Sequence, residues 1–438
     1  MAGKIPKAGY QAPVYIVDGA RTPFIKARGK PGSFTAADLA HAAGRPLLAR
    51  LADKVPPVAF DHVILGNVMA GPDEANIARV ASLRLGFGNK VPAFTVHRNC
   101  ASGMQAVDCA ALEITTGRAD LVLAGGVEAM SHAPLLWSRQ MAGWLGDLYK
   151  AQGVGKAAAF ARLRPSMLKP VIGLLLGLTD PIVGLNMGQT AEELAHRFGI
   201  TREEMDRFAM ESHMGLARAQ DEKRLAEIEP LFDAKGKVYI QDDGLRRETT
   251  LEALAKLKPA FDKPFGAVTA GNSAQITDGA AWLVVASQKA VEKYDLPVLA
   301  QLRHTRWAGV PPEHMGLGPA NAMALLLVDM ELSSEDIGHW EINEAFAAQV
   351  LAVMKAFADP GYLRNEAGVD ASFAPIPRER LNVDGGAICI GHPVGASGAR
   401  IILRGVHNMR RHDDKYGVAS LCIGGGQGGA VLLERTTT

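Results

Sequence analysis

The sequence predicts an α/β protein in which helices cover a largely parallel, buried sheet. Short apolar runs rich in β-forming residues, most of them ending in glycine or turn residues, alternate with longer segments of helical period. In addition, one order of elements occurs in both halves of the chain, as a duplicated α/β unit would produce. Together these observations favour alternating layers of sheet and helix.

The strand candidates occupy residues 13–20, 60–69, 119–130, 280–287 and 416–426. Segments 35–53 and 101–117 lie between them and repeat apolar residues with the helical period. Runs that are apolar on both faces are typical of strands buried between helices. The order of the elements therefore predicts a sheet that is covered on both sides.

The internal repetition has the same form in each half. A loop at Cys100 leads through small residues into a helix that ends near Gly117, and then into the strand 120–126. In the second half, a loop leads through Gly395 and Gly398 into a helix and then into another glycine-terminated strand. Duplication explains this pattern, but chance repetition among α/β proteins is an alternative that the sequence leaves open.

Residues 131–261 interrupt this rhythm. Segment 131–170 carries basic and aromatic side chains against a single acid, Asp147; they are Arg139, Lys150, Lys156, Arg162, Arg164 and Lys169, with Trp137, Trp144, Tyr149 and Phe160. Further on, Gln189–Leu225 is strongly helical, and Thr201 and Glu204 have the spacing of a capping box. We therefore predict an insertion between two core halves.

The composition argues against several classes of protein. A formal net charge of +1 and a pI of about 7.8 give no overall field for holding nucleic acid. The four cysteines form no C-x-x-C pair or Cys/His cluster, so no metal site is predicted, and their low number fits a reducing compartment. No apolar core precedes Val14, which argues against a secretory signal. We expect a soluble, cytoplasmic protein.

Cys100 is the first candidate catalytic residue. It is predicted to lie in the turn between a strand that ends near His97 and the helix that follows. The free N–H groups and the positive dipole of a helix N-terminus stabilise a thiolate, so we expect a lowered pKa and a nucleophilic sulfur. A small buried hydrophobe is the other interpretation of Cys100, and it is the one we adopt for Cys109, within the helix.

A reactive cysteine usually has a base nearby. His392 is the best candidate, because it lies between Gly391 and Pro393 in a loop that follows an apolar strand. His97 and His132 are alternatives by their proximity to Cys100 in the sequence. Periodicity alone favours His392 only slightly.

Two further junctions carry candidate residues. Cys422 ends a strand and precedes a glycine cluster, where the backbone could approach a ligand closely or simply form a tight hairpin. Asn343 follows another strand and is either a functional amide or an N-cap. Gly424, Gly426 and Gly429 have the G-x-G-x-x-G spacing, but no helix and second strand follow them, so a nucleotide site is not predicted.

The segments that carry these residues resemble the signatures of the thiolase family, and they occur in the order of that family. They are NCASGMQA at 99–106, AGGVEAMS at 124–131, NEAFAAQ at 343–349, NVDGGAICIGHPVGASGAR at 382–400 and CIGGGQGGA at 422–430. The resemblance extends from about Val14 to Leu433. It implies a thiolase-like fold of two similar βαβαβαββ halves in five α-β-α-β-α layers. The expected units are 1–130 with 262–290, an inserted loop domain at 131–261, and 291–438.

The resemblance also implies acyl transfer between thioesters of coenzyme A, with CoA as a co-substrate and no permanently bound cofactor. In this scheme Cys100 attacks the 3-keto carbon and holds the acyl group, and His392 takes the thiol proton. Cys422 protonates the carbanion that leaves as acetyl-CoA. His392 and a water fixed by Asn343 would hold the enolate oxygen, and the N–H groups of Cys100 and Gly424 would form a second oxyanion hole.

The same resemblance implies a set of CoA contacts, namely Arg224 near the nucleotide end, Met187, and Ala270, Ser273 and Ala274 in a loop along the pantetheine. The family commonly has N-A-S-G in this loop, whereas this chain has Asn272, Ser273, Ala274 and Gln275. Many short-chain thiolases carry a histidine where this chain has Asn186. The first departure argues against a direct serine contact, whereas Asn186, the long insertion between Asn343 and His392 and the enlarged basic-aromatic loop favour a degradative enzyme over one restricted to acetoacetyl-CoA.

The resemblance therefore favours a 3-ketoacyl-CoA thiolase of fatty-acid β-oxidation, similar to the thiolase subunit of multienzyme oxidation complexes. The alternatives are a biosynthetic acetyl-CoA acetyltransferase, a ketoacyl synthase and a non-catalytic homologue that binds lipid or acyl-CoA. A homodimer or larger assembly is expected, with a hydratase/dehydrogenase subunit as a further partner. Segment 131–170 could dock that partner or an anionic membrane, cover the CoA phosphates, or be a solvated face.

Overall fold

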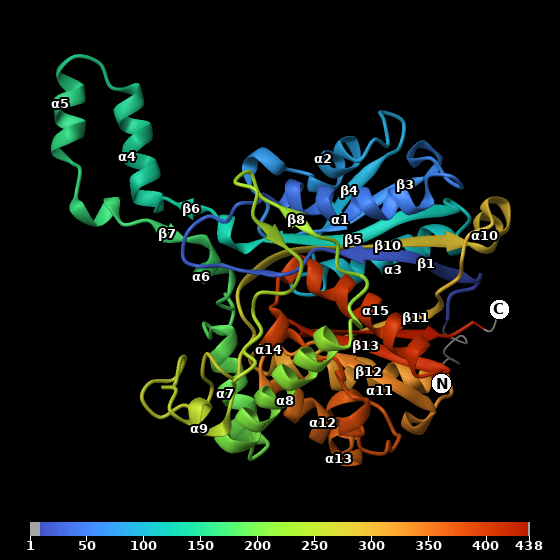
Figure 1. Cartoon of the computed structure of the whole chain (residues 1–438). Coiled ribbons are helices and arrows are strands. Elements are labelled where there is room, and N and C mark those ends of the chain that lie inside the picture. The colour runs from blue at the N-terminus through green and yellow to red at the C-terminus, as the bar shows by residue number, and fades with distance from the viewer. Residues whose placement is uncertain (1–8, 437–438) are drawn as a thin grey trace, which may run out of the picture.

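Residues 9–436 are described by a computed structural model (Figure 1). In spatial order, the strands of the first half are β4 (Ala93–Val96), β3 (His62–Gly66), β5 (Leu121–Ala129), β10 (Thr277–Ser287) and β1 (Val14–Arg21), and the short β2 (Ile25–Lys26) pairs with β10. β3 runs parallel to β4 and β5, whereas β10 runs antiparallel to β5 and β1. Every residue of β5 is buried, as the doubly apolar sequence of this strand requires.

The second half repeats this arrangement with β12 (Ile337–Ile342), β13 (Tyr416–Ile423), β14 (Gln427–Glu434) and β11 (Ala300–Gly309). β12 and β13 are parallel, and β14 is antiparallel to both of its neighbours. At the place of β4, this half has a single bridge between Trp340 and Leu381. The start of β1 pairs with the start of β11, so the two halves are joined edge to edge.

The five predicted layers are confirmed (Figure 1). The outer helices are α1 (Ala36–Leu51) and α2 (Ile77–Arg84) on the first half, and α11 (Gly318–Asp329) and α12 (Ala347–Phe357) on the second. Helices α3 (Ser102–Thr115) and α15 (Val394–Arg411) form the middle layer and contact each other. Their apolar side chains share one core cluster with strands from both halves. The duplicated α/β unit inferred from the sequence is therefore present.

Small residues after Cys100 allow the two middle helices to approach each other closely. A Cβ atom on Gly103 would lie 2.8 Å from the Gly395 carbonyl oxygen, and one on Gly398 would lie 2.5 Å from the Met104 amide nitrogen. Real Cβ atoms do not come this close to backbone, so both positions require glycine. The glycines near the N-termini of α3 and α15 thus bring the two preceding loops together.

The chain leaves the sheet after β5 and returns at β10, the neighbouring strand. The intervening elements are β6 (Leu135–Leu136), α4 (Arg139–Lys150), α5 (Val154–Ala161), β7 (Val171–Ile172), α6 (Gly173–Gly177), α7 (Met187–Arg197), α8 (Arg202–Asp221), β8 (Leu231–Phe232), β9 (Val238–Tyr239) and α9 (Leu251–Ala255). The capping box of Thr201 and Glu204 is confirmed at the start of α8. The domain boundaries proposed from the sequence stay predictions.

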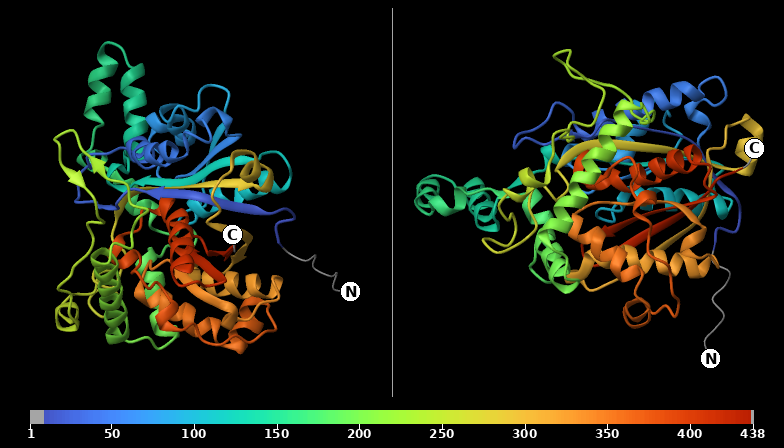
Figure 2. Two further views of the ribbon diagram at one scale, coloured as in Figure 1. Left: turned by 45° about the vertical axis from the view of Figure 1, so that its right-hand side comes forward. Right: turned by 60° about the horizontal axis from the view of Figure 1, so that its bottom comes forward.

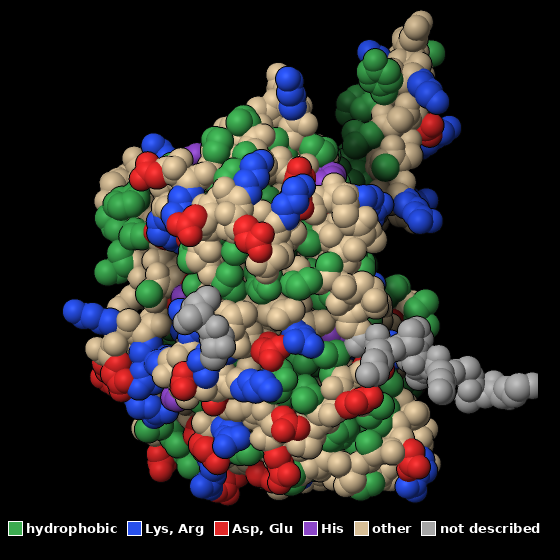
Figure 3. Space-filling view, turned by 90° about the vertical axis from the view of Figure 1, so that its right-hand side faces the viewer, with side chains coloured by type: hydrophobic (Ala, Val, Ile, Leu, Met, Phe, Trp, Pro, Cys, Tyr) green, Lys and Arg blue, Asp and Glu red, His purple; other side chains and the backbone are tan. Residues whose placement is uncertain are grey.

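Helices α4 and α5 form a hairpin that projects from the layered body on the two-stranded ribbon β6–β7 (Figures 1 and 2). Trp144 and Phe160 pack edge to face inside this hairpin, and the Trp144 indole donates to the Ala159 carbonyl oxygen at 2.8 Å. In Figure 3 the hairpin projects at the upper right and carries both basic and hydrophobic side chains. Tyr149 and Val154, at its tip, are almost fully exposed.

Two expectations about secondary structure are wrong. The sheet is mixed and not largely parallel, because hairpin-like returns at β10 and β14 reverse the chain direction in each half. The apolar run before His392 is the short helix α14 (Ala387–Ile390) and not a strand. Its apolar residues are buried on all sides, so they show no periodicity that separates a helix from a strand. The remaining helices are α10 (Gln288–Tyr294) and α13 (Pro360–Tyr362).

Within residues 9–436, no helix combines the length and the apolar character that crossing a membrane requires. The same part of the chain contains no group of three or more His, Cys, Asp or Glu side chains arranged to hold a metal ion.

Candidate active site

Cys100 lies in a tight turn between β4 and α3, as predicted. Asn99 adopts the left-handed conformation with φ of 43°, and the Ala101 amide donates to the Arg98 carbonyl oxygen at 3.0 Å. The Ser102 hydroxyl donates to the Asn99 carbonyl oxygen at 2.7 Å and accepts from the Arg98 amide at 2.9 Å. These hydrogen bonds fix the backbone on both sides of the thiol.

The thiols of Cys100 and Cys422 and the imidazole of His392 line one cavity of about 460 Å³, which we call the central pocket. Cys100 comes from the first half of the chain, and the other two residues come from the second. The pocket walls are mostly apolar and include Met187, Phe261, Met315 and Phe346. A largely apolar cavity with a few polar groups is the usual form of a small-molecule site.

The imidazole of His392 is held in one tautomer. Its Nδ1 lies 2.6 Å from the Ser397 hydroxyl oxygen, and that hydroxyl donates its one proton to the Pro393 carbonyl oxygen at 3.1 Å. With the hydroxyl proton on the Pro393 carbonyl, the hydroxyl oxygen accepts from Nδ1–H and Nε2 carries a lone pair. Nε2 is buried and has no hydrogen-bond partner among residues 9–436. It is therefore available as a proton acceptor in the pocket.

The electrostatics of the two groups correct one prediction. Burial raises the pKa of the Cys100 thiol, and the backbone N–H groups of Gly424 and Cys100 only partly oppose this effect. Burial, and next the charge of Arg400, lower the pKa of His392 to about 3. The expected thiolate at the helix head is wrong for the resting site, because desolvation outweighs the helix dipole. Cys100 and His392 are both neutral, so the thiol must lose its proton as it attacks.

Cys422 is the last residue but one of β13 and pairs with Gly428 of β14. The residues between the strands form a tight hairpin, and Gly425 and Gly426 have positive φ angles of 91° and 84°. Burial and the nearby Cys100 raise the pKa of the Cys422 thiol. The Asn99 amide group donates to the Gly424 carbonyl oxygen at 2.7 Å, which holds the hairpin beside the Cys100 turn.

Asn343 follows β12 and is fully buried. It is not an N-cap, because α12 begins at Ala347 and its capping position is Phe346. The side-chain nitrogen Nδ2 of Asn343 is buried without a hydrogen-bond partner in the described part of the chain, like Nε2 of His392. His392 lines the central pocket, whereas Asn343 does not and precedes the lining residues Ala345 and Phe346 in the chain.

The other histidines and Cys109 lie outside the central pocket. His97 is exposed at the end of β4, and the exposed His132 contacts the Gly32 carbonyl oxygen. Cys109 packs against the core cluster of the middle layer, as predicted.

The residues expected to contact CoA separate into two groups. Met187, Ser273 and Ala274 line the central pocket. Ala270 is exposed and does not line it. Arg224 is also absent from its walls, because the guanidinium donates to the buried carboxylate of Asp384 at 3.2 Å. The structure therefore gives no support to Arg224 or Ala270 as ligand contacts.

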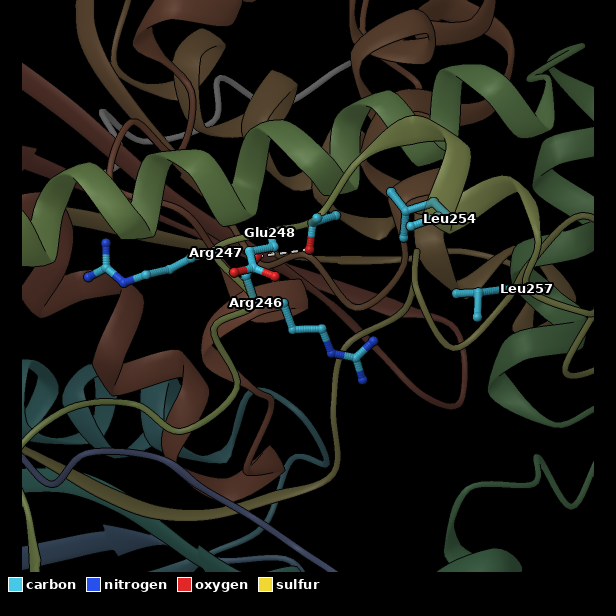
Figure 4. A pocket seen from close by; sticks show the side chains of 7 residues that line it. Arg246, Arg247, Glu248, Leu254 and Leu257 are labelled. Carbon is cyan, nitrogen blue, oxygen red and sulfur yellow. Dashed lines mark hydrogen bonds between the residues drawn. The ribbon is translucent and has the colours of Figure 1, made fainter.

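A second cavity of about 540 Å³, which we call the basic groove, is lined by Arg246, Arg247, Glu248, Thr249, Ala253, Leu254 and Leu257 (Figure 4). Arg247 pairs with Asp221, whereas the Arg246 guanidinium forms no hydrogen bond or ion pair within residues 9–436. The Gln275 amide, in the wall of the central pocket, donates to the Gly244 carbonyl oxygen at 2.9 Å. This hydrogen bond ties the wall of the central pocket to the chain two residues before Arg246.

The sequence alone did not identify three features of this site. Ser397 contacts Nδ1 of His392, Arg246 places a cation in the basic groove, and the buried Arg400 lowers the pKa of His392. The adjacent arginines of LRRETT at 245–250, just before α9, were the available signal for the groove. Ser397 and Arg400 are four residues or more from any candidate, and only the helix α15 brings them into place.

Comparisons with known proteins agree with this geometry. The family model described as thiolase, N-terminal domain, matches residues 14–289, and that of the thiolase C-terminal domain matches residues 296–435. Human mitochondrial 3-ketoacyl-CoA thiolase is 39% identical over 429 residues, which is 97% of this chain and 98% of that protein. The bovine mitochondrial trifunctional enzyme subunit beta is 37% identical over 424 residues, which is 96% of this chain and 88% of that protein.

Solved structures give the same result. The crystal structure of human mitochondrial 3-ketoacyl-CoA thiolase in complex with CoA superposes with a TM-score of 0.84 at 36% identity, covering 98% of this chain and 99% of that chain. An acetyl-CoA acetyltransferase from Bacillus anthracis also has a TM-score of 0.84 at 36% identity, covering 97% and 99%. The chain therefore belongs to the thiolase family.

Proposed function

We propose that this protein cleaves 3-ketoacyl-CoA with free CoA, giving acetyl-CoA and an acyl-CoA shortened by two carbons. The observation that carries the proposal is the meeting of two thiols and an imidazole with a free Nε2 in one pocket. One thiol serves as the nucleophile, the imidazole as its base, and the second thiol as the acid. This set fits C–C cleavage, which requires a proton donor for the carbanion that leaves.

In the first step the Cys100 sulfur attacks the 3-keto carbon while Nε2 of His392 takes the thiol proton. The carbonyl electron pair moves to oxygen and returns as the C–C bond breaks, leaving an acyl thioester on Cys100. The departing electron pair takes the proton of Cys422, and acetyl-CoA leaves. The Cys422 thiolate then takes the thiol proton of free CoA as the CoA sulfur attacks the thioester, and the released Cys100 takes back the proton held by His392.

The oxygen atoms that gain charge have donors nearby. The N–H groups of Cys100 and Gly424, which act on the Cys100 thiol, suit the tetrahedral intermediate at that sulfur. Protonated His392 and a water on the free Nδ2 of Asn343 suit the enolate of acetyl-CoA. One such donor is typically worth about 3 kcal/mol of barrier.

The basic groove is the proposed site of the CoA phosphates. Within residues 9–436 the Arg246 guanidinium forms no ion pair, and Gly244, two residues before Arg246, accepts from the Gln275 amide in the wall of the central pocket. Arg246→Ala should raise KM for CoA about two- to fivefold with kcat nearly unchanged, because one exposed charge contact is lost in ground and transition state alike. Arg224→Ala is the matched control and should leave KM for CoA unaltered.

The experiment that tests the function is an assay of the purified protein with acetoacetyl-CoA and with a long-chain 3-ketoacyl-CoA, each with free CoA. Rapid thiolysis of the long-chain substrate supports a degradative enzyme. The alternative is a biosynthetic acetyl-CoA acetyltransferase, the activity named for the Bacillus anthracis relative. Such an enzyme would act on acetoacetyl-CoA alone and condense two acetyl-CoA molecules. Binding of acyl-CoA without turnover would instead support a non-catalytic homologue.

The proposed assembly has two parts. β4 lies at the open edge of its sheet and precedes the Cys100 turn, so pairing of this edge with a second copy would give a homodimer. The hairpin α4–α5 is the proposed docking element for a dehydrogenase-type subunit, since relatives named as trifunctional enzyme subunit beta are subunits of a larger enzyme. None of residues 139–161 lines the central pocket or the basic groove, which disfavours a CoA cover.

Sedimentation equilibrium of the purified chain tests the homodimer. Co-sedimentation with anionic vesicles, repeated after charge reversal of Arg162 and Arg164, tests a membrane surface as the alternative occupant of the hairpin. Binding that depends on these charges would favour the membrane over a protein partner. The cytoplasmic location stays a prediction.

A further inference from the structure

Arg400 is a buried cation with little compensation. Its side chain is 1% exposed, and the nearest carboxylate oxygen, Oε2 of Glu341, lies 3.5 Å from Nη1. The other oxygen of Glu341 is already used by His339 at 2.9 Å and Asn408 at 3.1 Å. Nε and Nη1 of Arg400 have no hydrogen-bond partner within residues 9–436. Burying a charge in this way is costly, so packing alone does not explain this arginine.

Arg404, one helical turn further along α15, shows the contrast. It is equally buried, but its Nη1 donates to both carboxylate oxygens of Glu227 at 3.1 Å. It also donates to the Arg224 carbonyl oxygen. The charge of Arg404 is thus matched by a structural ion pair, whereas Nη2 of Arg400 is directed at the Asn343 side chain.

The partner of Arg400 on that side is the Asn343 amide, whose oxygen Oδ1 lies 3.5 Å from Nη2. A guanidinium can only donate, so it selects the oxygen end of the amide. The NH₂ end of Asn343 must then point away from Arg400, and its nitrogen is the buried atom without a partner. An amide turned the other way would present an acceptor, which repels an enolate oxygen.

We propose that Arg400 is a positioning residue that turns the N–H donors of Asn343 toward the oxygen on which charge develops. This inference rests on the proposed thiolase reaction and adds a residue to it. Arg400 also acts on His392, because its positive charge disfavours the imidazolium. The other titratable groups around His392 are the Cys100 and Cys422 thiols and Glu128 of β5, whose carboxylate accepts from the Gly395 amide at 3.0 Å. Arg400 is the cation of this set.

The test compares Arg400→Met and Arg400→Lys with the matched control Arg404→Lys. Thiolysis kcat of Arg400→Met should fall about 100-fold with KM for CoA unchanged, since a donor that acts in the transition state is misplaced. Acylation of Cys100 by a simple acyl-CoA requires no enolate and should fall much less. Arg404→Lys should keep the wild-type ratio of the two rates.

A second readout is the pH dependence of Cys100 alkylation by iodoacetamide, which reports the state of His392. In Arg400→Met the apparent pKa of the lower limb should rise, because the repelling charge is gone. Arg400→Lys keeps a charge without the planar fork, so it should restore this pH profile but not the full kcat. A purely structural role would not separate the two readouts.

The double variant Arg400→Met/Glu341→Gln covers the case in which the single variant fails to fold, because it removes both charges of the pair. It should fold and still lose thiolysis about 100-fold. Wild-type kcat in this double variant, or an equal loss in Arg404→Lys, would overturn the proposal. If the wild-type protein cleaves no 3-ketoacyl-CoA, the proposed function fails, and an unchanged alkylation profile would then overturn the effect on His392 separately.

Discussion

The two halves of the molecule use the same structural position for different chemistry. In the first half, the loop that enters the central helix α3 carries Cys100, and in the second, the loop that enters α15 carries His392. Both helices are buried in the middle layer, and their glycine contacts bring the two loops together. The comparison teaches that the pocket is a product of the duplication: neither half contains both the nucleophile and its base.

The largest expected effect comes from removing the nucleophile of the first half. Cys100→Ser should lower thiolysis by about 10⁴-fold or more, because a serine hydroxyl is far less acidic and less nucleophilic than the thiol. Trapping of a radiolabelled acyl group on the protein measures the same loss. An acyl-enzyme that still forms in this variant, for example on Cys422, would break the assignment of the nucleophile to the first half.

A change in the second half should separate the two chemical steps. Cys422→Ala should lower C–C cleavage by about 10² to 10⁴-fold, the usual range for loss of a general acid, while acylation by a simple acyl-CoA continues. Single-turnover measurements with 3-ketoacyl-CoA and with acyl-CoA give the two rates. Equal losses of both rates would mean that Cys422 acts on the nucleophile and not on the carbanion.

The contact between the halves should be sensitive to one methyl group. Gly398→Ala places a Cβ against the backbone of Met104 and should destabilise the protein by about 1–3 kcal/mol. Gly405→Ala, on the same helix, meets only the end of the Leu433 side chain at 3.3 Å and is the matched control. Denaturant unfolding measures both. Equal stability of the two variants would show that the halves are not held at this crossing.

The smallest effect is the pH dependence of stability that His392 contributes. Its folded-state pKa of about 3 lies below the ordinary value of 6.5, so below pH 6.5 the unfolded state binds a proton that the folded state does not. Stability should therefore fall as the pH drops from about 6.5, by at most about 1.4 kcal/mol per pH unit for this group. His392→Gln should remove that part of the slope between pH 7 and pH 5, and an unchanged slope would contradict the depressed pKa.

The sequence predicted the elements that local pattern encodes. The buried strands, the repeated loop-helix-strand order and the glycines beside Cys100 all follow from periodicity and residue size. The prediction of a lowered pKa for Cys100 failed because desolvation of the thiol depends on which side chains cover it. Tertiary packing determines that cover. Arg224 and Arg246 illustrate the same limit: only the fold brings Asp384 to Arg224, and within residues 9–436 it gives the Arg246 guanidinium no ion pair.

The hydrogen bond from Ser397 to the Pro393 carbonyl affects the position of the proton on the His392 imidazole. The proline ring restricts the backbone at residue 393, and the Pro393 carbonyl oxygen accepts the hydroxyl proton of Ser397. A Ser397 hydroxyl oriented in this way favours the His392 tautomer with its hydrogen on Nδ1. The basicity of Nε2 of His392 therefore depends on the backbone of residues 393–397. A change of backbone conformation there would alter this basicity without altering any reacting atom.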